Sequence, residues 1–128
     1  MTAKQYLGET KTITRRILAM EKRRVEYARK AQGERLTPQE AGAYLDIEQD
    51  LIREVELLRD RQRETSAMIG EMEDERHKLI LEERYLNGYM FQRIARDAGY
   101  SYDHTIRLHR QALAAFGKIY KAWHIAAP

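Results

Sequence analysis

Apolar residues recur in steps of three and four along the first quarter of the chain, the spacing that places side chains on one face of an α-helix. The repeat predicts a helix over residues 4–32, and Gly33 is expected to end it as a C-terminal cap. The face follows a heptad pattern with polar members at Thr10 and Arg24. Its members are Tyr6, Thr10, Ile13, Ile17, Met20, Arg24, Tyr27 and Ala31.

A second helix start follows after a short connection, in the segment "LTPQE". Thr37 suits the N-cap position, Pro38 the first helical position, and Glu40 the partner position of a capping box. The short connection predicts that a helix over residues 38–72 returns antiparallel to the first. Residues 1–72 therefore predict a coiled-coil-like antiparallel helical hairpin, whose apolar face packs within the chain or recruits a second copy. The face of the second helix comprises Ala41, Tyr44, Glu48, Leu51, Val55, Leu58, Gln62, Thr65, Ile69 and Met72.

The rest of the chain, residues 73–128, predicts shorter helices. Asp74 can cap a third helix that runs to Leu86, where Asn87-Gly88 supplies a left-handed end. Two further helices, expected over residues 91–98 and from about Tyr102 to about Ala122, meet at a glycine. The whole chain is therefore expected to be all-α, with a boundary near residues 72–75.

The last two expected helices have the pattern of a helix-turn-helix. Ala95 gives the small side chain needed where the helices cross, and Gly99 tolerates the positive φ of the turn. Ser101 is a candidate N-cap for the second helix, whose expected buried side is Thr105, Leu108, Ala112, Leu113 and Phe116.

The outward positions of this motif are candidates for contact with DNA. The predicted DNA-binding residues are Gln92, Arg93, Ser101, Tyr102, Asp103, Ile106, Arg107 and Arg110. Arg107 lies near the start of the second helix, the part that enters the major groove most deeply, and is expected to contact guanine. Arg110, one turn further on, is expected to meet phosphate.

Charge supports a polyanion partner for the C-terminal third. Residues 1–83 hold 16 Lys/Arg against 18 Asp/Glu, whereas residues 84–128 hold 7 against 2, a net charge of +5. Disulfides and thiolate metal sites are excluded, because the chain has no cysteine. The sequence shows no membrane span, signal peptide, phosphate-binding loop, nucleophile motif or metal-ligand spacing. We therefore expect a cytoplasmic protein that is not an enzyme and needs no cofactor.

The segment "LILEERYLNGYMFQRIARDAGYSYDHTIRLHRQAL" resembles region 4 of bacterial sigma factors. It is more similar still to small phage and prophage proteins that join a sigma-like C-terminus to an N-terminal helical region, whose opening resembles "KQYLGETKTITRRI". The resemblance implies a phage transcription regulator in a bacterial host cell, in some branches an activator of late genes. Double-stranded DNA would be the partner, with RNA polymerase as a second candidate and the N-terminal helices as a route to a homo-oligomer.

Two residues depart from the pattern of that family. Thr105 stands where such helices usually carry Val or Ile, so the second helix is expected to seat less firmly. Asp103 places a negative charge at the start of the helix, where it either accepts from a cytosine amino group or caps the helix. We favour the cap.

Two other functions fit the same residues. A small terminase-like protein also recognises phage DNA through a helix-turn-helix, but that class usually carries the motif at its N-terminus. An adaptor would bind RNA polymerase through the sigma-like segment without touching DNA. A ring-like oligomer would favour DNA packaging, and the absence of salt-dependent DNA binding would favour an adaptor.

Overall fold

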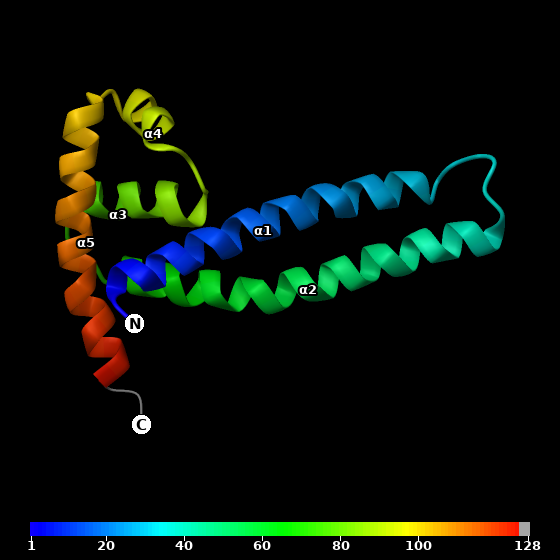
Figure 1. The fold of residues 1–128 in the computed structure, drawn as a ribbon, viewed down its shortest axis with the longest axis horizontal. Coiled ribbons are helices and arrows are strands. Elements are labelled where there is room, and N and C mark those ends of the chain that lie inside the picture. Colours follow the sequence, from blue (N-terminus) through cyan, green and yellow to red (C-terminus); the bar gives the residue numbers. More distant parts are fainter. Residues whose placement is uncertain (126–128) are drawn as a thin grey trace. The chain divides into compact units, whose positions relative to one another are not determined.

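The computed structural model describes residues 1–125, and every regular element among them is a helix, which confirms the all-α prediction (Figure 1). No helix in this range is both long and apolar enough to cross a lipid bilayer. The elements are α1 (Ala3–Lys30), α2 (Pro38–Gly70), α3 (Glu75–Leu81), the π-helix η1 (Glu82–Leu86), α4 (Phe91–Ala98) and α5 (Tyr102–Ile125).

The chain forms two compact units, and both long helices contribute to each of them. The core unit contains residues 1–14 and the chain from residue 61 onward, whereas the two-helix unit contains residues 15–60. The division predicted near residue 72 separated an assembly region from a DNA-binding region. That division of roles stays a prediction, because the compact units are defined by packing alone.

The core unit is built around aromatic rings from both ends of the chain. The Tyr6 ring lies 5.2 Å from that of Tyr120 and 6.3 Å from that of Phe116, between ring centres. These rings bury most of their surface, which gives the large apolar transfer energy typical of aromatic side chains. The buried apolar cluster contains Tyr6, Leu7, Met68, Ile69, Met72, Ile80, Leu81, Tyr85, Ile94, Leu108, Ala112, Phe116 and Tyr120.

Buried hydroxyl groups join α1 to the end of α2 within the core unit. The Thr10 and Thr65 hydroxyls lie 3.0 Å apart, and the Thr65 hydroxyl donates to the hydroxyl of Tyr6 at 3.1 Å. The Tyr6 hydroxyl in turn donates to Glu64 at 2.8 Å. Burial of these polar groups is tolerated because each finds a partner.

The two-helix unit pairs α1 with α2 through a much smaller apolar core. Its buried apolar side chains are Ile17, Met20, Leu51 and Val55. Polar and aromatic pairs cross between the helices elsewhere. They are Glu21 with Arg59 at 3.6 Å, Arg24 with Glu48 at 3.7 Å, and Tyr27 with Tyr44 at 6.0 Å between ring centres. The residue numbers rise on α1 as they fall on α2, so the two helices are antiparallel in this unit.

The connection between α1 and α2 confirms one prediction and corrects another. The Thr37 hydroxyl accepts from the backbone N–H of Glu40 at 3.1 Å, as expected for an N-cap. The expected left-handed cap at Gly33 is wrong, because Gly33 has no positive φ and α1 already ends at Lys30. A Cβ at Gly33 would lie 3.3 Å from the Lys30 carbonyl oxygen and 3.4 Å from Leu36, so a larger residue there would require these neighbours to shift by a few tenths of an ångström.

The third predicted helix begins and ends as expected, but it changes from an α-helix to the π-helix η1 at Glu82. The Asp74 carboxylate caps α3 by accepting from the backbone N–H of Arg76 at 2.9 Å, and Gly88 ends η1 with φ 76°. In η1 the N–H of Asn87 donates to the Glu82 carbonyl five residues earlier. The carbonyl of Tyr85 accepts from the buried Thr14 hydroxyl at 2.6 Å.

Candidate nucleic-acid interface

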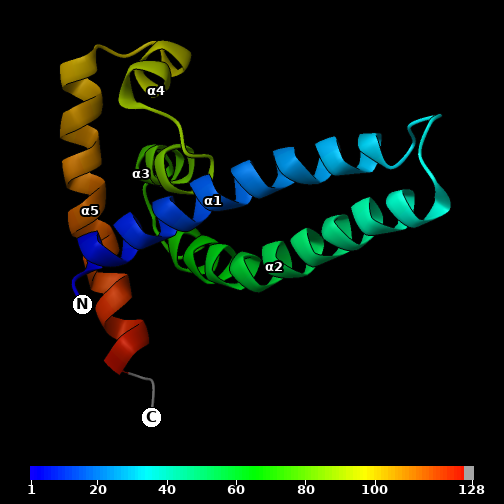
Figure 2. The ribbon, with the colours of Figure 1, turned by 45° about the vertical axis from the view of Figure 1, so that its right-hand side comes forward.

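The turn between α4 and α5 is set by a glycine and a serine. Gly99 has φ 73°, a left-handed conformation that a residue with a Cβ adopts at an energetic cost. The Ser101 hydroxyl accepts from the backbone N–H of His104 at 3.1 Å and so caps α5. Figures 1 and 2 both show α4 beside the first turns of α5. The turn therefore fixes where the start of α5 emerges.

One side of α5 packs into the core unit, largely as predicted. Thr105, Leu108, Ala112 and Phe116 are buried, and Leu113 is half-buried. The hydroxyl of Thr105 donates to the Ser101 carbonyl at 3.0 Å. This bond satisfies the hydroxyl locally, so a threonine can occupy this fully buried position.

The predicted DNA-binding residues gather on α4, the turn and the first turns of α5. Gln92 and Arg93 lie exposed in the first turn of α4. Ser101, which caps α5, is also exposed. On α5 itself Ile106 is half-buried, and the exposed members are Tyr102, Asp103, Arg107 and Arg110. Ser101 caps α5, so the preferred prediction that Asp103 caps this helix is wrong. Asp103 lies in the first turn of α5, where its carboxylate complements the helix dipole.

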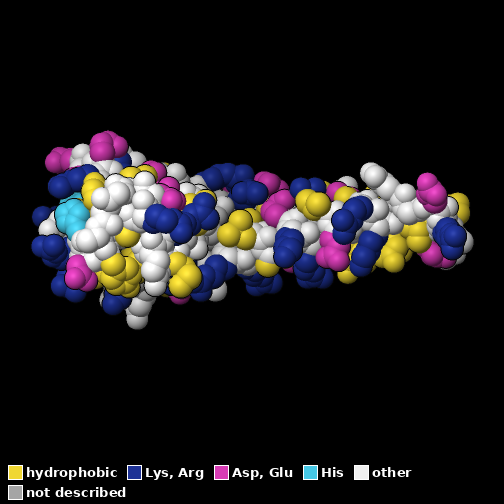
Figure 3. All heavy atoms as spheres, turned by 90° about the horizontal axis from the view of Figure 1, so that it is seen from above, with side chains coloured by type: hydrophobic (Ala, Val, Ile, Leu, Met, Phe, Trp, Pro, Cys, Tyr) yellow, Lys and Arg dark blue, Asp and Glu magenta, His cyan; other side chains and the backbone are white. Residues whose placement is uncertain are grey.

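The cations of this surface differ in how far their charge is already balanced. Arg93 lies 3.5 Å from Asp97, and Arg96 lies 3.8 Å from the same carboxylate. Within the part of the chain that the structure describes, Arg107 and Arg110 are exposed and form no salt bridge. These two guanidinium groups therefore carry the net positive charge at the start of α5. Figure 3 shows Lys and Arg side chains along the outer edge of the region around α5.

A small hollow beside Arg107 adds Arg76 and His104, which were not among the predicted DNA-binding residues. Arg76 and His104 line it together with Arg107, Leu108 and Gln111, and its volume is about 210 Å³. Arg76 is oriented by a bond of 2.9 Å to the Asp74 carboxylate. The same bond, together with the backbone N–H that Asp74 accepts, lowers the pKa of Asp74 to about 2. The sequence shows that Arg76 follows the predicted cap Asp74 by two residues. It does not show that Arg76 lies near α5, because that depends on tertiary packing.

A half-buried histidine joins α5 to η1 and α4. His109 Nε2 lies 2.7 Å from the Tyr85 hydroxyl, and its ring meets the Phe91 ring edge-on at 4.8 Å between centres. Burial, followed by the nearby charge of Arg84, lowers the pKa of His109 to about 4. The imidazole is therefore neutral near pH 7 and packs between α5, η1 and α4.

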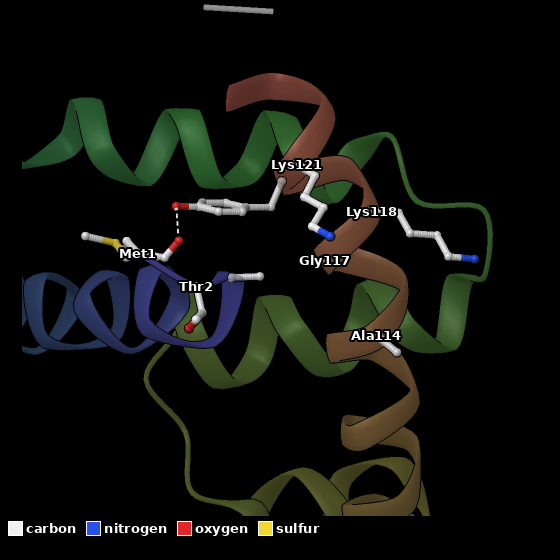
Figure 4. A pocket seen from close by; sticks show the side chains of 8 residues that line it. Met1, Thr2, Ala114, Gly117, Lys118 and Lys121 are labelled. Atoms are coloured by element: carbon white, nitrogen blue, oxygen red, sulfur yellow. Dashed lines mark hydrogen bonds between the residues drawn. The ribbon is translucent and has the colours of Figure 1, made fainter. Parts of the chain in front are cut away.

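A larger hollow lies elsewhere in the core unit, between the first residues of α1 and the second half of α5 (Figure 4). Its volume is about 460 Å³, and the small residues Ala3, Ala114 and Gly117 leave this space. The Tyr120 hydroxyl donates to the Met1 carbonyl at 3.2 Å across one side of it. None of the eight predicted DNA-binding residues lines it, so it is separate from the candidate interface.

The exposed side chains of the α4–α5 surface are hydrogen-bonding and charged groups. Among residues 1–125, no three His, Asp or Glu side chains form a group that could hold a metal ion. The surface offers exposed guanidinium, hydroxyl and amide groups on a fixed scaffold, which suits hydrogen bonding to phosphates and base edges. Comparison of the chain with models of protein families, with curated proteins and with solved structures gives no match.

Proposed function

We propose that this protein binds double-stranded DNA by placing the first turns of α5 in the major groove, and that it regulates transcription as a sigma-like phage protein. The observation that carries the proposal is the division of α5 into two sides. Leu108 and Ala112 are buried in the core unit, while Arg107 and Arg110 are exposed and form no salt bridge within residues 1–125. Such a helix presents its cations to a partner while its apolar side holds it in place.

The positions of the two arginines suggest different contacts. Arg107 is closer to the start of α5 and lines the hollow with Arg76, so it is the candidate for bidentate contact with guanine O6 and N7. Arg110 is one turn further along and is the candidate for phosphate. Arg76, held by Asp74 at the start of α3, offers a further phosphate contact beside the groove.

The scaffold supports this use of α4 and α5. The left-handed Gly99 and the Ser101 cap hold the turn, and the His109–Tyr85 bond fixes α5 to η1. A rigid scaffold lowers the entropy cost of binding, because the contacting side chains start close to their bound positions. The resemblance to sigma factor region 4 supports transcription as the setting, with RNA polymerase as a second candidate partner.

The test uses the full chain, because the core unit needs residues 1–14. Selection from a random duplex library would yield the preferred site, and binding would then be measured on that site and on a scrambled duplex at two salt concentrations. Arg107→Ala should cost about 1–3 kcal/mol on the selected site and little on the scrambled one. Arg110→Ala should weaken both equally and lower the salt slope by about one.

Arg29→Ala, which removes one exposed charge from the two-helix unit, is the matched control and should leave both affinities unchanged. Equal loss on both duplexes for Arg107→Ala would assign Arg107 to phosphate and contradict the groove placement. Failure to bind any duplex in a salt-dependent way would reject DNA binding and favour an adaptor of RNA polymerase. A ring-like oligomer of the full chain would favour DNA packaging over transcription.

A further inference from the structure

The two helices of the two-helix unit carry opposite charge. The α1 segment of residues 15–30 holds seven Lys/Arg and two Asp/Glu, a net charge of +5. The α2 segment of residues 38–60 holds two Lys/Arg and seven Asp/Glu, a net charge of −5. Each helix is therefore complementary to the other within one chain, and equally complementary to the opposite helix of a second chain.

The same unit exposes apolar side chains in a regular arrangement. Leu18 is 55% exposed, Val25 58% and Leu45 47%, and Ile52 is partly buried. Leu18 and Val25 are seven residues apart, and so are Leu45 and Ile52, so each pair lies along one stripe of its helix. Figure 3 shows apolar side chains exposed between charged ones along this part of the chain.

An ion pair between the helices places the two stripes on the same side of the unit. Glu21 is three residues after Leu18 and four before Val25, so it lies on the α1 stripe. Arg59 is seven residues after Ile52, so it continues the α2 stripe. The Glu21 carboxylate meets the Arg59 guanidinium at 3.6 Å, and the stripes therefore flank one shared face, which we call the stripe face.

The buried core of the two-helix unit is small compared with the apolar surface that the stripe face exposes. Four apolar side chains are buried there, against three large apolar side chains on the stripe face that are about half exposed. Two helices joined by a short connection are marginal in water unless a further layer covers their apolar surface. A second layer of helices would supply it.

We infer that the stripe face binds a second copy of this chain, forming a two-fold symmetric four-helix bundle in which each α1 lies on the partner's α2. Two face-to-face arrangements are compatible with two-fold symmetry. An axis along the helices sets each +5 segment against a −5 segment, whereas an axis across the helices sets like charges against each other. Charge complementarity selects the first arrangement.

This arrangement fixes which apolar side chains meet. Within one chain, Tyr27 is level with Tyr44 and Arg24 with Glu48, so Val25 is level with Leu45. A two-fold axis along the helices preserves these levels, so Val25 packs against Leu45 of the partner subunit. The α1 segment is about 24 Å long and two helices are about 20 Å wide, so about 1,000 Å² is buried in total. That area is at the low end of specific interfaces and corresponds to a weak dimer.

Sedimentation of the full chain between about 5 and 200 µM at low salt measures this association. Val25→Asp should raise the dimer dissociation constant by about 100-fold, because the complex would bury an unpaired charge. Leu45→Lys should do the same. An equimolar mixture of the two variants should regain most of the association, because the introduced charges meet across the bundle.

Leu57→Asp is the matched control. Leu57 is 75% exposed and lies about 140° around α2 from Ile52, so its replacement should leave the dimer unchanged. Circular dichroism of each variant verifies that its helices form. A wild-type chain that stays monomeric at 200 µM would overturn the inference, as would an unchanged dimer with Val25→Asp. Loss in both single variants without recovery in the mixture would overturn the pairing of α1 with the partner's α2.

Discussion

The two units of this protein use the same pair of long helices in different ways. In the core unit, α1 and α2 meet aromatic rings and buried hydroxyl groups, and thirteen buried apolar residues form one cluster. In the two-helix unit, the same helices bury four apolar side chains and otherwise meet through ion pairs and one tyrosine pair. Continuity of a helix along the chain therefore does not imply uniform stability along it.

The largest effect is expected from the centre of the core unit. Phe116 is completely buried and contacts rings from both ends of the chain. Phe116→Ala should lower the free energy of unfolding by about 3–5 kcal/mol, because it removes an aromatic side chain and leaves a cavity. Chemical denaturation followed by tyrosine and tryptophan fluorescence measures it. A loss below about 1 kcal/mol would mean that the aromatic cluster is not the main source of stability.

A smaller and more local effect is expected in the two-helix unit. Val55 is 2% exposed, so Val55→Asp should bury an unpaired charge and cost about 2–4 kcal/mol. Hydrogen exchange should accelerate across residues 15–60 and much less in α3 and α5. Leu57→Asp, at an exposed neighbouring position, should change exchange little. Equal acceleration throughout the chain would show that the two units unfold together and would break the comparison.

Acid should destabilise the core unit through His109. The pKa of His109 is about 4 in the folded protein, against 6.5 for an ordinary histidine, so the unfolded chain takes up the proton more readily. Stability is therefore complete above pH 6.5, falls as the pH drops from 6.5 to 4, and is not lowered further by this group below pH 4. The loss should be about 2 kcal/mol once partial exposure is allowed for.

His109→Gln keeps a hydrogen-bonding partner for the Tyr85 hydroxyl and removes the titration, so it is the informative variant. Its stability should be nearly constant between pH 6.5 and 4 in thermal melts, apart from the contributions of carboxylates. Asp74 contributes at lower pH, because its pKa of about 2 makes its stabilisation fade between about pH 4 and 2. An unchanged slope between pH 6.5 and 4 in His109→Gln would assign the acid sensitivity to other groups.

Local sequence signals predicted the helices of both units well. Caps at Thr37, Asp74 and Ser101 and the left-handed glycines 88 and 99 all occupy their predicted places, because each depends on a few neighbouring residues. The end of α2 is less well predicted. Apolar spacing continues to Met72, but α2 ends at Gly70 and Met72 is buried after the turn.

Tertiary packing explains what the sequence pattern missed. The heptad pattern predicted Leu58 and Val55 to be equally buried. Leu58 is only half-buried, because the helices of the two-helix unit form a narrow contact. Leu7 lay outside the predicted face but is completely buried in the core unit. At the candidate interface, the outward residues of α5 followed from helical spacing, whereas Arg76 depends on how α3 packs against α5.

The position of Tyr6 and Leu7 in the aromatic cluster has a consequence for protein synthesis. Phe116 follows Tyr6 by about 110 residues, so at about 5–20 residues per second the ribosome adds it some 5–20 s later. During that interval residues 15–60 have left the exit tunnel and can pair, while the apolar start of α1 has no aromatic partner. The nascent chain therefore leaves Tyr6 and Leu7 accessible to chaperones until α5 emerges, and the core unit closes only then.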